Sequence, residues 1–176
     1  MKDEDPFELL GLERRFDIDR AALQAAYLKR SAQLHPDRFP DPIDQAEAAA
    51  KAACLNTARD VLADDERRAD VLLRLLGGPT REEDKSLPDG FLMDIMEARQ
   101  EMEDAVGSGD PAQRKRVEDW VHQQRSGFLD SVGRLFGKVA TNADAQTLAG
   151  IRVQLNAWRY IERMIEQLDP AHELDL

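Results

Sequence analysis

Cysteine, histidine and long apolar runs are scarce in this sequence, and each shortage excludes a class of protein. The single cysteine, Cys54, excludes an internal disulfide framework, and the three histidines lack zinc-ligand spacing. No apolar stretch approaches the roughly 20 residues that span a bilayer. The acidic start, Met1 to Pro6, resembles neither a secretory signal nor a transit peptide. We therefore expect a soluble, cytoplasmic protein.

Positive charge is also in the minority. The chain of 176 residues has a net charge of -11, which argues against general binding to nucleic acid or to an anionic membrane, because both need basic surface. Apolar residues make up 42% of the chain, enough for one ordinary domain or two small ones. Alternating β-branched residues are sparse, whereas Ala, Leu, Glu, Gln and Arg are abundant. The sequence therefore predicts an all-α fold.

The first half of the chain predicts a pair of antiparallel helices. After a short helix that stops at Gly11, a second helix should run from an Asp19 N-cap to about Leu34. A third helix is expected from about Gln45 to Ala63. Each of the two longer helices carries an apolar stripe at helical spacing, so the two should pack together.

The loop between these two helices is expected to be about ten residues long. Three prolines prevent the second helix from continuing, namely Pro36, Pro40 and Pro42. Asp44 with Glu47 three residues later resembles a capping arrangement, so the third helix should begin just after Asp44.

The second half of the chain predicts a three-helix bundle. An amphipathic segment from Glu66 to Leu76 ends at Gly77-Gly78-Pro79 and a polar stretch, which indicates a domain boundary. Three longer helical patterns follow, at residues 91–106, 112–139 and 144–168. The resulting division has three parts: a domain at residues 1–76, a linker at 77–90 and an antiparallel bundle at 91–176.

The tripeptide His35-Pro36-Asp37 lies at the tip of the expected helical pair. Pro36 fixes one backbone dihedral, while His35 and Asp37 offer directional hydrogen bonds from a loop between two rigid helices. An alternative is that His35-Pro36 only ends a helix and Asp37 only satisfies a turn. A catalytic or metal site would need a third converging group, and His122 and His172 lie in other segments without ligand-like spacing.

A helix with a basic end, this tripeptide and a second antiparallel helix together resemble a J domain. In that family the hairpin binds an Hsp70-type ATPase and speeds its hydrolysis of ATP. The resemblance implies that the contact is made or shaped by Lys29, His35, Pro36, Asp37 and Arg38.

The resemblance extends along most of the chain, which looks like a member of the HscB/Hsc20 family of J-type co-chaperones in iron-sulfur cluster assembly. It rests on the segments at residues 7–12, 35–39, 68–73 and 91–94. The resemblance implies that the N-terminal J domain is joined to a bundle that binds the cluster scaffold protein (IscU-type) and delivers it to a dedicated Hsp70 (HscA-type). The implied protein is not an enzyme and has no metal or cofactor of its own. The zinc-binding cysteine module of some eukaryotic relatives is absent, which favours a bacterial-type form.

The helix that follows Pro88 has two arcs at 100° per residue. The arc expected in the bundle core contains Phe91, Ile95, Ala98, Met102 and Val106. The adjacent arc begins apolar and ends polar or acidic: Leu92, Met93, Met96, Glu97, Gln100 and Asp104. By family resemblance, this second arc contacts the scaffold together with Tyr160 of the last helix, and methionine suits such a surface because it repacks easily. Alternatively, its apolar residues pack against the J domain or the linker.

Three residues depart from the family pattern. Arg30 falls close to an apolar stripe where an aliphatic residue is usual, so its aliphatic stem would have to snorkel. Arg59 stands where an aromatic is common, which predicts looser or rearranged packing, and Gln100 is neutral where an acid is common. Two further hypotheses stay open: a J protein whose bundle recruits another client or self-associates, and a small helical enzyme that uses His35 and Asp37.

Overall fold

The computed structural model describes residues 5–35, 38–139 and 144–168. Within these ranges every regular element is helical, so the all-α prediction is confirmed. The chain divides into two compact units, Met1–Leu75 and Leu76–Leu176. Across the described ranges, no helix is both long enough and apolar enough to cross a membrane.

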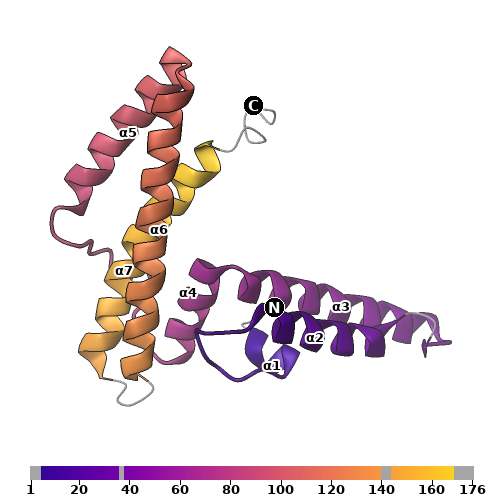
Figure 1. Cartoon of the computed structure of the whole chain (residues 1–176). Coiled ribbons are helices and arrows are strands. Elements are labelled where there is room, and N and C mark those ends of the chain that lie inside the picture. The colour runs from indigo at the N-terminus through magenta and orange to yellow at the C-terminus, as the bar shows by residue number, and fades with distance from the viewer. Residues whose placement is uncertain (1–4, 36–37, 140–143, 169–176) are drawn as a thin grey trace. The chain divides into compact units, whose positions relative to one another are not determined.

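The N-terminal unit is built around a helical hairpin. Its elements are α1 (Pro6–Leu10), α2 (Arg20–Ser31), the short 3-10 helix η1 (Ala32–Leu34), α3 (Pro42–Ala63) and α4 (Asp65–Leu75). Figure 1 shows α2 and α3 lying side by side, with α1 next to them. The core of the unit consists of buried apolar side chains, chiefly Phe7, Leu10, Leu23, Leu55, Leu62, Leu72 and Leu73.

Helix caps set the bounds of the first two helices. The Asp19 carboxylate accepts hydrogen bonds from the backbone N–H groups of Ala21 and Ala22 at 3.2 and 3.1 Å, which satisfies two donors that the start of α2 would leave unpaired. Gly11 ends α1 in the left-handed region at φ 70°, a conformation that favours glycine. Both features follow the predicted bounds.

Helix α3 begins earlier than the sequence predicts. Asp41, rather than Asp44, is its N-cap, because the Asp41 carboxylate accepts from the N–H of Ile43 at 2.7 Å. Pro42 occupies the first turn, where a missing N–H costs nothing and the fixed φ suits a helix. The expected capping by Asp44 and Glu47 is therefore wrong, and the loop is shorter than about ten residues. Glu47 instead pairs with Lys51 one turn later, at 3.7 Å.

A buried arginine joins the end of the hairpin to α4. Arg68 is 7% exposed and donates to the backbone oxygens of Phe16 and Leu62 at 2.8 and 2.6 Å. It also pairs with the carboxylate of Asp65 at 2.5 Å, and its guanidinium lies over the Phe16 ring. Since a buried charge is tolerated only when paired and hydrogen-bonded, this cluster holds the loop before α2 against α4.

The C-terminal unit is a bundle of α5 (Phe91–Ser108), α6 (Pro111–Val139) and α7 (Ala145–Leu168). Figure 1 shows α6 and α7 packed along one another. Glu162 of α7 links them, since one carboxylate oxygen accepts from Arg125 of α6 at 2.9 Å and from the Trp158 indole at 2.7 Å. Trp158 itself is fully buried in the core.

The predicted core arc of α5 is confirmed at its N-terminal end and wrong at its C-terminal end. Phe91, Ile95 and Ala98 are buried, but Val106 is 53% exposed and Ala105 is buried instead. At 100° per residue, Val106 lies about 60° from the direction of Phe91 and Ala105 about 40° on the other side. Ala105, and not Val106, therefore continues the buried stripe at this end of α5.

Candidate functional site

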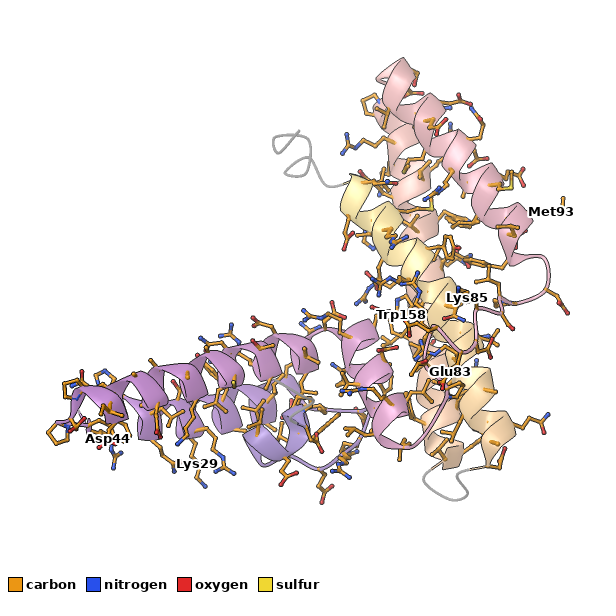
Figure 2. The ribbon with its side chains drawn as sticks, turned by 180° about the vertical axis from the view of Figure 1, so that it is seen from behind. Lys29, Asp44, Glu83, Lys85, Met93 and Trp158 are labelled. Atoms are coloured by element: carbon orange, nitrogen blue, oxygen red, sulfur yellow. The ribbon has the colours of Figure 1, made fainter. Side chains whose placement is uncertain are left out.

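The first candidate surface is the turn that follows α2. His35 caps η1 with extended backbone (φ -63°, ψ 132°), and its side chain is exposed. Lys29 lies exposed in the last turn of α2, where a cation interacts favourably with the helix C-terminus. Figure 2 shows Lys29 on this hairpin, with Asp44 farther toward its tip. Pro36 and Asp37 of the predicted tripeptide lie outside the described residues.

Hydrogen bonds hold the turn on both sides of the tripeptide. The N–H of Arg38 donates to the backbone oxygen of His35 at 3.0 Å, and the Arg38 guanidinium donates to the backbone oxygen of Ala32 at 3.4 Å. On the α3 side, the amide of Gln45 donates to the backbone oxygen of Phe39 at 2.8 Å. These bonds attach Arg38 to η1 and Phe39 to α3, so the described residues just after the tripeptide are held in place.

The second candidate surface is on α5, and we call it the outer face: Leu92, Met93, Met96, Glu97, Gln100 and Asp104. All six side chains are exposed. The three apolar residues, Leu92, Met93 and Met96, are 55, 77 and 65% exposed, and Figure 2 shows Met93 projecting from the start of the helix. A contiguous exposed apolar group on a single face is typical of a contact surface.

Tyr160 of α7 joins the start of this surface. Its ring packs edge-on against Phe91, with the centroids 5.9 Å apart, and Phe91 packs in the same manner against Phe128 of α6 at 6.0 Å. Tyr160 is half-buried. Since Phe91 directly precedes Leu92, the structure brings Tyr160 close to the apolar start of the outer face.

The rest of the outer face is acidic. Glu97 and Asp104 lie on it, and Gln100 donates to the Asp104 carboxylate at 3.1 Å. Gln100 therefore orients an acidic neighbour through a hydrogen bond instead of adding a charge. An apolar start with an acidic continuation suits a partner surface that is apolar with a basic border.

Two family models match the chain in separate regions. One, described as the DnaJ domain, matches residues 5–71, and the other, described as the HSCB C-terminal oligomerisation domain, matches residues 87–169. A curated relative from Aeromonas hydrophila, "Co-chaperone protein HscB homolog", is 31% identical over 166 residues, which cover 93% of each chain. The chain belongs to the HscB co-chaperone family.

Other HscB proteins agree with this assignment. The homolog from Chromobacterium violaceum is 41% identical over 105 residues, covering 58% of this chain and 60% of its own. The solved "Chaperone HscB from Vibrio cholerae" superimposes with a TM-score of 0.77 at 26% identity, covering 98% of this chain and all of its own. Human co-chaperone HscB, at 24% identity, shares the fold with a TM-score of 0.81, over 100% of this chain and 85% of its own.

Arg59 is accommodated by a cation–π contact. Its guanidinium lies 4.7 Å from the centroid of the Tyr27 ring, across the hairpin. The hydrogen bond and charge of Asp60, at 2.7 Å, raise the pKa of Arg59, and the Tyr27 hydroxyl donates to Asn56 at 2.8 Å. The arginine thus replaces aromatic packing with a stacked, ion-paired group.

The Arg30 side chain extends away from the apolar stripe of α2. Its guanidinium reaches the end of α1, where one nitrogen lies 2.9 Å from the position that a Cβ on Gly11 would occupy. A groove of about 550 Å³ opens beside it between α1, α2 and α3, lined among others by Leu34 and Cys54. Glycine at position 11 is favoured by the backbone, since its φ of 70° lies in the left-handed region, whereas the flexible end of Arg30 can shift.

In the described parts of the chain, no three His, Cys, Asp or Glu side chains gather in a way that could hold a metal ion. Among the described residues, the candidate functional sites are the two exposed surfaces. Two polar residues of α7 that the sequence patterns did not indicate, Arg152 and Asn156, donate hydrogen bonds to backbone oxygens of the segment before α5. Both are polar yet buried, at 3 and 7% exposure.

Proposed function

We propose that this chain stimulates the ATPase of an Hsp70-family partner (HscA-type) through its J domain and delivers an iron-sulfur scaffold protein (IscU-type) to that partner. In this proposal Lys29, His35, Pro36, Asp37 and Arg38 contact the ATPase. The outer face of α5 and Tyr160 contact the scaffold. In this proposal the partners carry out the chemical reactions. The chain and its partners act in the cytoplasm, a reducing compartment that suits a chain with a single cysteine.

The exposed apolar start of the outer face is the observation that best supports the proposed binding of the scaffold protein. Leu92, Met93 and Met96 are more than half exposed on a helix whose other side supplies the bundle core. Exposed methionines adapt to a partner at low cost. This exposure favours a partner surface over packing against the linker.

The braced turn after α2 supports the ATPase half of the proposal. His35 is exposed, while the described residues Arg38 and Phe39 are hydrogen-bonded to η1 and to α3. Residues that are already ordered lose less conformational entropy on binding. The exposed cation of Lys29 adds a charge that steers an acidic partner surface.

Stimulation of ATP hydrolysis tests the first half. Single-turnover hydrolysis by the cognate Hsp70 should accelerate when the native chain is added and should stay at its basal rate with His35→Gln. His122→Gln, at an exposed position of α6, is the matched control and should stimulate like the native chain. Equal stimulation by both variants would contradict the role of His35.

Scaffold affinity tests the second half. The double variant Leu92→Ala with Met96→Ala should bind the purified scaffold protein at least tenfold more weakly in calorimetry, since it truncates two anchors of the apolar patch. Val106→Ala, an equally exposed apolar residue on the same helix but off the outer face, should bind normally. No binding by the native chain would reject the scaffold assignment.

Self-association is a second candidate for the bundle, because the matched family is described as an oligomerisation domain. The same outer face could then meet a second copy. Sedimentation velocity across a range of concentrations separates the two functions. A dimer that the double variant abolishes would favour self-association.

A further inference from the structure

We infer that Asn156, together with Arg152, is a positioning residue for scaffold binding, because it holds the segment that leads into α5. We call this segment, residues 79–86, the strap. Both residues belong to α7 and touch no part of the outer face. Their proposed role is to fix where α5 begins, and it rests on the proposed scaffold binding.

The strap is hydrogen-bonded to α7 at its two ends. Arg152 donates from Nε to the backbone oxygen of Pro79 at 2.9 Å. Asn156 donates from its amide nitrogen to the backbone oxygens of Asp84 and Ser86, at 2.9 and 3.0 Å. In Figure 2, Glu83 and Lys85 mark the strap where it passes α7 near Trp158.

Arg152, Asn156 and Tyr160 form one stripe on α7, because residues four apart lie on the same side of a helix. The chain from the strap to the start of α5 follows this stripe. Arg152 binds its first residue, Asn156 binds its end, and Tyr160 packs against Phe91, the first residue of α5. Successive turns of α7 therefore hold successive parts of the chain.

The Asn156 side chain is specialised for this contact. Its two donated bonds go to strap carbonyls, and its buried amide oxygen has no hydrogen-bond partner within the described residues. A buried acceptor without a partner is costly. The hydrogen-bonding contribution of Asn156 in the described structure therefore lies in the strap, and not in α7 itself.

The strap is a preformed turn that such a contact can hold. The N–H of Thr80 donates to the Glu83 carboxylate at 2.7 Å, and the N–H of Asp84 donates to the backbone oxygen of Thr80 at 3.1 Å. The N–H of Ser86 then donates to the Asp84 carboxylate at 2.8 Å. These bonds order the strap up to Ser86, four residues before Gly90, the N-cap of α5.

Helix α5 is held at its start by the packing of Phe91 against Tyr160 and Phe128, but no side chain caps it. Its N-cap is Gly90, with φ 80° and no side-chain hydrogen bond to the first turn. Only four residues of α5 are buried, against ten in α7. Since Leu92 and Met93 lie in the first turn, loss of the strap should let this turn fray and scatter the apolar start of the outer face.

The test uses Asn156→Asp, which has nearly the same shape but replaces the donating amide with an acceptor. We expect faster amide hydrogen exchange at residues 84–94 and scaffold affinity weaker by roughly tenfold. Asn156→Ser, which keeps one hydroxyl donor, should show an intermediate loss of scaffold affinity of roughly threefold. This second variant keeps the test valid if Asn156→Asp fails to fold. Stimulation of the Hsp70 by the variant without scaffold should stay at the native level.

Val121→Ala, a core truncation in α6, is the control for stability. It should lower Tm without changing exchange at residues 84–94 or scaffold affinity. The positioning role is overturned if the strap stays protected in Asn156→Asp, if it opens without loss of affinity, or if Val121→Ala weakens binding equally. Should the native chain bind no scaffold, the proposed function fails, while the exchange measurement still decides whether Asn156 orders the start of α5.

Discussion

The rings of Phe91 and Tyr160 meet edge to face, with centroids 5.9 Å apart. Tyr160 thereby sits between a buried anchor and the exposed apolar start of the outer face. Replacement by alanine removes contact area from both. We expect Tyr160→Ala to weaken scaffold binding by roughly tenfold, as for an aromatic anchor of an interface, when affinity is measured by calorimetry.

Tyr160→Phe separates the ring from the hydroxyl. If packing against Phe91 is what matters, Tyr160→Phe retains native affinity, whereas a direct hydrogen bond to the scaffold would make it as weak as Tyr160→Ala. Exchange of residues 84–94 reports whether either variant disturbs the start of α5. Native affinity in Tyr160→Ala would remove Tyr160 from the interface.

Arg68 should determine the stability of the N-terminal unit. Arg68→Met would leave the backbone oxygens of Phe16 and Leu62 and the carboxylate of Asp65 without their guanidinium partner. Removing one member of a buried ion pair costs about 3–5 kcal/mol. The free energy of unfolding of this unit should fall by about that amount, measured by urea denaturation.

The two tryptophans, Trp120 and Trp158, both lie in the C-terminal unit, so fluorescence and circular dichroism separate the units. In Arg68→Met, the part of the dichroism transition that comes from the N-terminal unit should move to lower urea while the fluorescence transition stays in place. Arg67→Met, an exposed neighbour, should move neither. A shift in fluorescence of the same size would mean that the two units unfold together.

The sequence was sufficient for the helices but not for all of their ends. Period and caps placed α2 and α7 closely, because apolar stripes and N-cap residues act locally. The start of α3 was missed because Asp44 with Glu47 matches a capping pattern, whereas the actual N-cap is Asp41, which accepts from the N–H of Ile43.

The strap could not be predicted for a different reason. Its anchors, Arg152 and Asn156, lie about 70 residues from the carbonyls that they bind, as the separations of 73 and 72 show. Backbone carbonyls have no signature in a sequence, so a polar residue that binds them looks like any surface residue. The exposed outer face, in contrast, was predictable because it is a regular pattern on one helix.

Arg59 should contribute through its stacking as well as its charge. Arg59→Lys keeps the charge beside Asp60 but loses the planar contact with Tyr27. We expect Tm to fall by a few degrees at most, and to recover in Arg59→Phe, which restores ring packing. Thermal unfolding by circular dichroism provides the measurement, and a higher Tm for Arg59→Lys than for the native chain would show that stacking contributes nothing.

The strap should open in acid. The N–H and hydroxyl of Thr80 hold the pKa of Glu83 below its usual value of about 4, and the hydroxyl and N–H of Ser86 lower the pKa of Asp84. A carboxyl with a depressed folded-state pKa stabilises the fold above its unfolded pKa, and this contribution is lost as pH falls through the folded pKa. Amide exchange in the strap should therefore stay slow above about pH 5 and rise relative to exchange in α7 below about pH 4. Glu83→Gln should weaken protection at neutral pH and flatten the acid response, and an unchanged response in that variant would show that Glu83 does not hold the turn.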